Sequence, residues 1–153
     1  MNIYLRAIEE SDKQDVFEIF LNSRPDLLEL ISYDNQNENV ILSQFDLSQR
    51  YLDLRELDTR YVIIYENRTI GTLYLRINEK KIEVVSFAIL PLFRNKGIGT
   101  YILNEIINKY SDEFEIRLNV AWYNNEALKL YLRLGFEEIE DLGVYKELGI
   151  RRI

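Results

Sequence analysis

The sequence predicts a single α/β domain that spans residues 1–153. Three observations predict this class. A short apolar strand runs into an amphipathic helix between residues 83 and 110. Segments rich in β-forming residues lie on both sides of that stretch, and helical patterns occur before and after it. With 47% hydrophobic and 29% charged residues, a chain of 153 residues can bury one core without disulfides or a structural metal.

The stretch from residue 83 to residue 110 is the centre of the prediction. Its first part is a nearly continuous run of β-forming residues, and Pro91 stops that strand because proline cannot donate to a sheet ladder. A helix follows from about residue 98, because apolar residues recur at helical spacing. The apolar face of this helix consists of Ile98, Ile102, Leu103, Ile106, Ile107 and Tyr110.

Between this strand and helix lies the segment Arg94-Asn95-Lys96-Gly97-Ile98-Gly99. Glycines let a backbone pass close to a ligand, and the free N–H groups of a helix N-terminus bind anions. Arg94 and Lys96 add positive charge suited to phosphate. The dinucleotide-binding fingerprint does not fit, because Ile102 stands where its third glycine would be. The segment therefore indicates an anion site, with a plain helix-start turn as the alternative.

The first 58 residues predict one strand and three helices. Residues 3–8 form the strand, and Ser11-Asp12-Lys13-Gln14 has the pattern of a capping box that opens a helix through about residue 21. Pro25 suits the first turn of a second helix. Residues 34–39 are polar and predict a loop, and residues 43–57 predict a third helix. The expected apolar face of that helix holds Leu47, Tyr51 and Leu54.

From residue 60 the pattern changes to β. Residues 61–65 and 69–77 flank a short turn at residues 66–68, and residues 78–81 turn into the central strand. Residues 115–122 alternate as a strand, and a helix capped by Asn124 or Asn125 then ends at Gly135. Residues 136–140 and 143–148 are two closing strands. No repeat, low-complexity tract or linker divides the chain.

The residue types that are missing narrow the chemistry. The chain has no cysteine and no histidine, which excludes disulfides, thiolate metal sites, acyl-cysteine intermediates and imidazole catalysis. We therefore expect no metal. No apolar run approaches the ~20 residues that span a bilayer, and the first residues do not form a secretory signal. We expect a cytoplasmic protein with no membrane association.

The net charge of −7 is unevenly distributed. Residues 1–60 carry 13 acidic and 6 basic side chains, whereas residues 61–153 carry 13 of each. The first part of the chain therefore holds the whole acidic excess, which disfavours nucleic acid as a partner.

The segment 94–99, with the strand and proline before it and the helix after it, resembles a signature of the GNAT superfamily of acyl-CoA-dependent N-acetyltransferases. That signature is an Arg or Gln, two residues, Gly, one residue, then Gly or Ala. A second stretch is similar to another motif of the family, in the order Asn124, Ala127, Tyr131, Gly135-Phe136. The similarity covers most of residues 60–148 and, more loosely, residues 1–30. It implies a mixed, mostly antiparallel central sheet that splays at its middle, with helices on both faces.

The resemblance implies acetyl-CoA as cosubstrate. Main-chain groups of the central strand would hold the pantetheine arm around a bulge, whose freed N–H would bind the thioester carbonyl. The loop and the first helical turn would wrap the pyrophosphate, and one amide side chain would contact the pantetheine. The implied cofactor-binding residues are Phe87, Ala88, Ile89, Arg94, Asn95, Lys96, Gly97, Ile98, Gly99, Thr100 and Asn124.

Glu83 is the candidate general base. A lysine-like amine has a pKa near 10.4, so its deprotonation at pH 7 costs roughly 4–5 kcal/mol, and a base lowers that cost. Glu83 is a charged residue in an otherwise apolar strand, and the resemblance places a carboxylate there in several members. The alternatives are that Glu83 lies at a solvated strand start, or that it forms an ion pair with Lys80 or Lys81. Some relatives instead carry a carboxylate on the next strand, at the position of Asn119. An asparagine cannot act as a base, which favours Glu83 or an ordered water chain.

Tyr131 is the candidate general acid, since a phenol can return a proton to the departing sulfur and the family carries its acid at this place in the motif. The alternative is a core aromatic on an amphipathic helix. Aromatic residues at Trp122, Tyr123, Tyr33 and Tyr51 are candidates for the wall of an acceptor pocket, although such residues more often belong to a core.

These observations predict an enzyme that transfers an acetyl group from acetyl-CoA to a primary amine of a small molecule or a peptide, by direct attack on the thioester. The acidic first part of the chain favours a cationic acceptor. The alternatives are a catalytically silent acyl-CoA-binding sensor and an interaction module in which the two glycines only start a helix. The family often forms homodimers, and no residue of this sequence decides that point.

Overall fold

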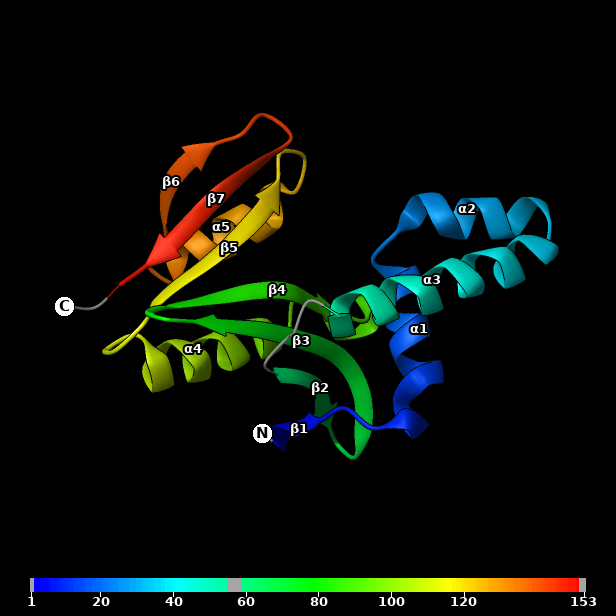
Figure 1. Ribbon diagram of the computed structural model, residues 1–153, viewed down its shortest axis with the longest axis horizontal. Helices are drawn as coiled ribbons and strands as arrows, with labels where there is room; N and C mark the ends of the chain where they lie inside the picture. The colour runs from blue at the N-terminus through cyan, green and yellow to red at the C-terminus, as the bar shows by residue number, and fades with distance from the viewer. Residues whose placement is uncertain (1, 55–58, 152–153) are drawn as a thin grey trace. The chain divides into compact units, whose positions relative to one another are not determined.

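The computed structural model describes residues 2–54 and 59–151, and of residues 48–54 it describes the backbone alone. Within these ranges the chain forms seven strands and five α-helices (Figure 1). The strands belong to one sheet in the order β1-β2-β3-β4-β5-β7-β6. The pair β4–β5 is parallel, whereas β1–β2, β5–β7 and β6–β7 are antiparallel. The predicted α/β class with a mixed, mostly antiparallel sheet is confirmed.

The strands and α-helices occur along the chain in the predicted order. In chain order they are β1 (Ile3–Ala7), η1 (Glu10–Asp12), α1 (Lys13–Asn22), α2 (Pro25–Tyr33), α3 (Gln36–Leu54), β2 (Thr59–Tyr65), β3 (Arg68–Asn78), β4 (Lys81–Ile89), η2 (Pro91–Phe93), α4 (Ile98–Tyr110), β5 (Glu115–Ala121), α5 (Asn125–Arg133), β6 (Glu137–Asp141) and β7 (Tyr145–Ile150). Two compact units share β3 and β4. The first is Met1–Tyr74 with Ser86–Arg94, and the second is Leu75–Val85 with Asn95–Ile153.

The core of the first unit forms where α1 and α3 meet β2. It consists of Val16, Phe17, Leu21, Ile41, Phe45, Val62 and Ile64. The rings of Phe17 and Phe20 lie 5.2 and 5.0 Å from the ring of Phe45, so aromatic packing joins the two helices. Val16 and Phe17 of α1 are buried in this core, and Phe20 packs against it from a partly buried position.

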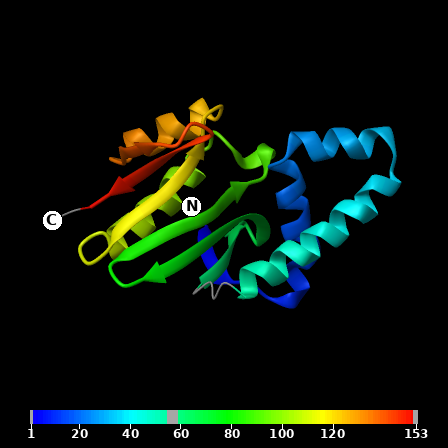
Figure 2. The same ribbon diagram turned by 45° about the horizontal axis from the view of Figure 1, so that its top comes forward.

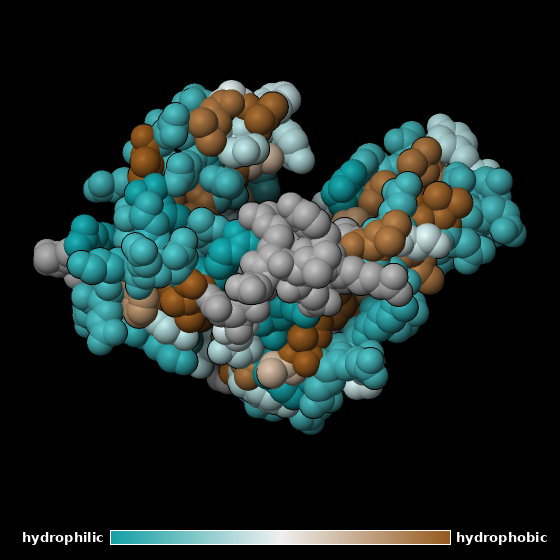
Figure 3. Space-filling model, in the orientation of Figure 1, coloured by the Kyte–Doolittle hydropathy of each residue, from teal (hydrophilic) through white to brown (hydrophobic). Residues whose placement is uncertain are grey.

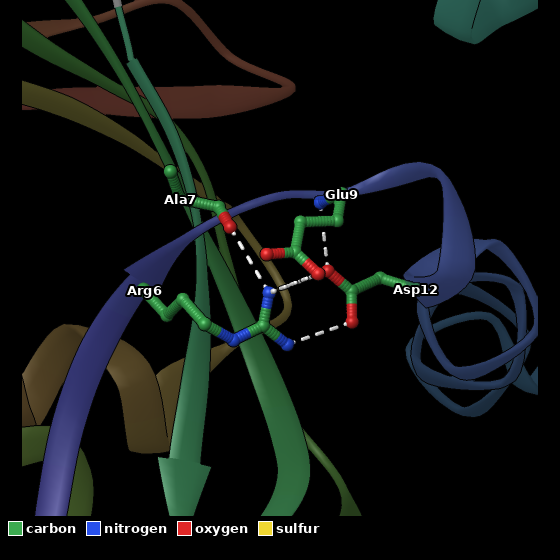
Figure 4. A network of polar contacts seen from close by, with 4 residues as sticks. All are labelled: Arg6, Ala7, Glu9 and Asp12. Carbon is green, nitrogen blue, oxygen red and sulfur yellow. Dashed lines mark hydrogen bonds and ion pairs between the residues drawn. The ribbon is translucent and has the colours of Figure 1, made fainter.

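The beginning of α1 differs from the predicted capping box at Ser11. Here the Asp12 carboxylate accepts a hydrogen bond from the backbone N–H of Glu9 at 2.8 Å, and the short helix η1 precedes α1. The Arg6 guanidinium of β1 also donates to both oxygens of Asp12, at 3.0 and 2.8 Å (Figure 4). Asp12 therefore binds the Arg6 guanidinium of β1 and the backbone N–H of Glu9, and these contacts connect β1 to the start of the helix.

The loop predicted at residues 34–39 is wrong, because α3 already begins at Gln36. The Asp34 side chain accepts a hydrogen bond from the Gln36 N–H at 2.9 Å, so the polar segment supplies a helix start. The predicted apolar face is also wrong at Leu47, which is exposed, while Ile41 and Phe45 are buried. The side chains of Tyr51 and Leu54 lie outside the described residues. Figure 3 shows apolar side chains at the surface of α2 and α3 as well.

The second unit contains the first half of β4 with β5, β7 and β6, and the helices α4 and α5 (Figure 2). One sheet face is apolar, since Ile82, Ile116 and Leu148 are buried there. The predicted apolar face of α4 is confirmed at Ile98, Ile102, Leu103, Ile106 and Ile107, which are all buried. On the opposite face of β5, Arg117 forms ion pairs with Glu115 and Glu147.

Two-residue turns join β2 to β3 and β3 to β4. Glu66 and Asn67 have φ angles of 50° and 63°, which are the positive angles of a type I′ hairpin turn. Glu79 has a φ of 48° at the second turn. The predicted hairpins are confirmed, and the second turn fixes which residues of β3 and β4 lie opposite each other.

Candidate functional site

The loop that enters α4 has the backbone conformation that the two-glycine motif predicts. Asn95 has a φ of 61° and Gly97 has a φ of 80°, and the helix begins at Ile98. A Cβ atom added to Gly97 would meet no other atom within 4 Å, so the backbone faces open space there. Residues 94–97 are exposed. The first N–H groups of an α-helix have no partner within the helix, so an accessible helix N-terminus can bind an anion.

Arg94 does not simply add its charge to this loop. Its Nε donates to the main-chain carbonyl of Ile89 at 2.8 Å, and its Nη2 donates to the carbonyl of Asn22 at 3.4 Å. These bonds connect η2 to β4 and to the end of α1 within the first unit. Arg94 therefore has a local structural role, and its contact with phosphate stays a prediction.

The predicted pantetheine-binding strand, at Phe87, Ala88 and Ile89, is half-buried. Within the first unit, β3 approaches it closely. A Cβ added to Gly71 would lie 2.5 Å from the Ala88 carbonyl oxygen, so only glycine fits at residue 71. The register of β4 with β5 runs from Lys81↔Glu115 to Val84↔Leu118, and β4 continues to Ile89. The bulge implied by the family stays a prediction.

Glu83 is on β4, and its Oε2 lies 3.2 Å from Nη1 of Arg76 on β3. The Glu83 side chain is 48% exposed, whereas the Arg76 side chain is 18% exposed. An ion pair was the alternative interpretation of Glu83, but Lys80 and Lys81 were the expected partners. The pair leaves the second carboxylate oxygen, Oε1, on a half-exposed side chain. Glu83 can therefore be a base and an ion-pair partner at the same time.

Tyr131 is on α5, and its ring packs against Phe136 with a centroid distance of 5.9 Å and an interplanar angle of 63°. Burial raises the pKa of the Tyr131 phenol above its ordinary value. The hydroxyl therefore stays protonated at neutral pH, as a general acid requires. Both interpretations of Tyr131 agree with this geometry, since the ring is packed and the hydroxyl retains its proton.

Asn124 caps α5, as the sequence predicts, because its Oδ1 accepts a hydrogen bond from the Ala127 N–H at 3.2 Å. The cap uses the oxygen of the amide group and orients the side chain at the helix N-terminus. Glu83, residues 95–100, Asn124 and Tyr131 all belong to the second unit, whereas residues 87–89 and Arg94 belong to the first.

The aromatic candidates for an acceptor pocket are mostly at the surface. Trp122 and Tyr123 are exposed side by side after β5, with a ring distance of 5.7 Å, and Tyr33 is exposed in the other unit. They are not core residues, which was the usual alternative. The fourth candidate, Tyr51, has its side chain outside the described residues. Asn119, at the position of a carboxylate in some relatives, is exposed on β5.

A family model described as the acetyltransferase (GNAT) family matches residues 14–136. The chain belongs to this family. Among curated relatives of this GNAT chain, the N-alpha-acetyltransferase of Sulfurisphaera tokodaii is 38% identical over 69 residues, which cover 43% of this chain and 41% of that protein. The N-alpha-acetyltransferase 50 of Danio rerio is 31% identical over 98 residues, which cover 59% and 58%. The chain thus spans less than two thirds of the length of these relatives.

Solved structures match the GNAT chain over nearly its whole length. A PaiA N-acetyltransferase from Thermoplasma acidophilum in complex with coenzyme A has a TM-score of 0.74 at 20% identity, and the match covers 99% of this chain and 100% of that one. A spermidine N-acetyltransferase from Vibrio cholerae in complex with CoA and spermine has a TM-score of 0.69 at 21% identity, with coverage of 97% and 94%. These likenesses show that the fold is that of GNAT proteins.

The contact of Arg76 with Glu83 in this GNAT chain was not among the expected contacts. The signal was available, since Arg76 and Glu83 are equally far from the turn at residues 79–80 and must lie opposite each other in a hairpin. Among the side chains of residues 2–47 and 59–151, no cluster of acidic groups could hold a metal ion. In the same ranges, none of the helices has the length and apolar character needed to span a membrane.

Proposed function

We propose that this chain transfers an acetyl group from acetyl-CoA to a primary amine, and that its acceptor is the α-amino group of a cationic peptide. The observation that carries the proposal is the N-terminus of α4. Its backbone turns at Gly97 in a left-handed conformation, faces open space there and is exposed to solvent. Family membership supports the interpretation of this anion site as a binding site for the pyrophosphate of acetyl-CoA.

The residues present fit that group. The N–H groups of residues 97–100 would bind the pyrophosphate, with the charge of Lys96 nearby. Asn124 and the main chain of residues 87–89 would hold the pantetheine arm. When bound, acetyl-CoA supplies a thioester whose carbonyl carbon an amine can attack.

The protein's own groups would then move two protons. The Glu83 carboxylate takes a proton from the acceptor amine, directly or through water, while the nitrogen–carbon bond forms. The carbon–sulfur bond breaks, and the Tyr131 hydroxyl gives its proton to the sulfur. Burial raises the pKa of the Tyr131 hydroxyl, so this group holds a proton to give, and the Glu83 carboxylate is held by Arg76.

A peptide α-amine suits this machinery better than a lysine or polyamine nitrogen. Its pKa is about 7.7–8.0, so its deprotonation at pH 7 costs only about 1 kcal/mol. The names of the relatives in Sulfurisphaera tokodaii and Danio rerio point to the same class. The acidic excess of residues 1–60 supports a cationic acceptor, because it attracts positive charge. We expect the reaction to occur in the cytoplasm.

The test measures thiol release with acetyl-CoA over a panel of acceptors, and acetyl-CoA binding by calorimetry. The key pair is a basic peptide with a free N-terminus and the same peptide with a blocked N-terminus and a free lysine. Spermidine is the third acceptor. Turnover only with the free N-terminus supports the proposal, and turnover only with spermidine or lysine would overturn the acceptor class. Binding without any turnover would indicate an acyl-CoA sensor, and no binding would refute the cofactor site.

A further inference from the structure

The Arg76 side chain on β3 is only 18% exposed, so most of its guanidinium is buried. One of its nitrogens, Nη1, contacts Glu83, while Nε and Nη2 are buried and have no hydrogen-bond partner among the described residues. A buried cation is costly unless a counter-charge compensates it. Glu83 is the carboxylate that faces it, so each of the two side chains depends on the other.

The surroundings of Glu83 strengthen this dependence. Its register partner on β5 is Arg117, whose guanidinium is already bonded to Glu115 and Glu147. A Cβ added to Gly149 would lie 3.2 Å from Cδ of Arg117, so glycine lets that side chain lie across β7. Arg117 thus binds the glutamates of β5 and β7, and Arg76 is the cation that holds Glu83.

The contact also gives the two oxygens of the Glu83 carboxylate different surroundings. Oε2 receives the Arg76 N–H, and Oε1 is left for an acceptor amine or a bridging water. A glutamate that is 48% exposed would otherwise sample several rotamers, each with the carboxylate in a different place. An ion pair to a largely buried partner on a rigid strand removes that freedom.

We propose that Arg76 is the positioning residue of the transfer reaction, and that it acts by holding the Glu83 carboxylate in one orientation with Oε1 toward the acceptor. This inference rests on the proposed function, because it assigns Glu83 the role of the base. The contact that the structure shows for Arg76 is with Glu83, so in this role Arg76 acts through that carboxylate. Its effect should therefore appear in kcat and depend on the presence of Glu83.

The experiment is a double-mutant cycle on kcat with the best acceptor, with Arg76→Met, Glu83→Gln and the combined variant. Arg76→Met should lower kcat at least roughly tenfold and leave the KM for acetyl-CoA and its binding affinity unchanged. In the Glu83→Gln background the same change should alter kcat by less than about threefold. Arg76→Lys retains the charge and should recover most of the activity.

The matched control is the ion pair of Lys146 with Glu138 on β7 and β6. It has the same distance of 3.2 Å and a glutamate that is 47% exposed. Lys146→Met should leave kcat unchanged. An additive cycle, an equal loss in Lys146→Met, or an unchanged kcat in a folded Arg76→Met protein would overturn the inference.

A stability measurement covers the case in which Arg76→Met does not fold. Glu83→Gln leaves the buried guanidinium without its counter-charge, so the urea midpoint should fall, and Arg76→Lys with its shorter donor should be an intermediate case. If Glu83→Gln has the wild-type midpoint, the two side chains are not coupled and the inference fails. A wild-type protein that turns over no acceptor refutes the proposed function, and this outcome is visible before any variant is made.

Discussion

The catalytic and the structural interpretations of Tyr131 differ only in the role of its hydroxyl group. The ring packs edge-on against Phe136 in either case, and burial raises the pKa of the hydroxyl. Tyr131→Phe keeps the ring and removes the proton donor. We expect acetyl-CoA affinity to be preserved and kcat to fall roughly 10²-fold or more. Steady-state kinetics with the best acceptor and calorimetry provide the two readouts.

Tyr110→Phe is the control for that substitution. Tyr110 is on α4 and also packs edge-on against a phenylalanine, Phe114, at 6.1 Å. Loss of its hydroxyl should leave kcat within about twofold of the wild type. If both variants retain full activity, Tyr131 is a packing residue and the proton reaches sulfur from water.

Gly97 offers a test of cofactor binding with a closely matched control. Gly97→Val should weaken acetyl-CoA binding at least tenfold, about 1.4 kcal/mol, because the side chain fills the open space before α4. The substitution also strains a backbone with a φ of 80°. Gly143 has a φ of 85° and the same open surroundings, but it lies in the turn between β6 and β7. Gly143→Val therefore introduces a similar strain at another place.

The comparison of the two valine variants isolates the ligand contact. Both proteins should lose some thermal stability, and calorimetry should show weakened binding in Gly97→Val alone. Equal acetyl-CoA affinities in the two variants would remove the N-terminus of α4 from the site.

The residues that sequence reasoning finds most easily are those with a local requirement. Gly97 needs a positive φ and Asn124 caps the helix that follows it, and both are visible as spacing in the sequence. Arg76 and the bonds of Arg94 depend on partners at other places. The bond from Arg94 to Asn22 joins residues 72 positions apart, and no local pattern predicts it.

At the scale of elements, Asp12 joins β1 to α1 through an electrostatic contact that depends on pH. The Arg6 guanidinium lowers the pKa of Asp12 below its ordinary value, and the backbone N–H of Glu9 adds to this effect. A carboxyl whose pKa is depressed in the folded state stabilises the fold above its unfolded pKa of about 3.9. That stabilisation is lost as the pH falls through the lower, folded pKa.

We therefore expect the free energy of unfolding to fall as the pH is lowered from about 5 toward 2, and to fall less steeply in Asp12→Asn. At pH 7 the variant should be less stable than the wild type by about 1 kcal/mol, since the amide keeps one acceptor for the Glu9 N–H and loses the charge. Urea unfolding at several pH values measures both effects. Parallel pH profiles for the two proteins would show that Asp12 contributes nothing through its charge.

The helix α3 shows why element boundaries were harder to predict than element types. Its first turn is polar, so periodicity places the start near residue 43, seven residues after the observed start at Gln36. Asp34 supplies the missing signal by accepting the Gln36 N–H, yet aspartate is equally common in loops. By contrast, α4 lies between Gly97 and an apolar stripe, and its start was predicted correctly.

At the scale of the whole molecule, the charge of −7 arises entirely from residues 1–60. Some of these acidic side chains already have partners within the fold. Asp46 is paired with Lys13 at 3.1 Å, Asp12 with Arg6, and Asp34 caps α3. The exposed glutamates Glu18, Glu29 and Glu38 are better candidates for a long-range field that attracts a cationic acceptor.

Salt dependence tests this field. For a basic peptide acceptor, kcat/KM should fall as the ionic strength rises from ~0.01 to ~0.15 M, because the Debye length shrinks from ~30 to ~8 Å. Changing Glu18, Glu29 and Glu38 together to Gln should flatten this dependence, chiefly by lowering the rate of encounter.

The control changes three exposed glutamates of the second unit to Gln, namely Glu105, Glu113 and Glu137, which alters the net charge by the same amount. If both triple variants respond to salt as the wild type does, the acidic excess serves solubility and does not guide the acceptor. If both flatten the curve equally, the total charge of the chain attracts the acceptor, and the acids of residues 1–60 have no special part in it.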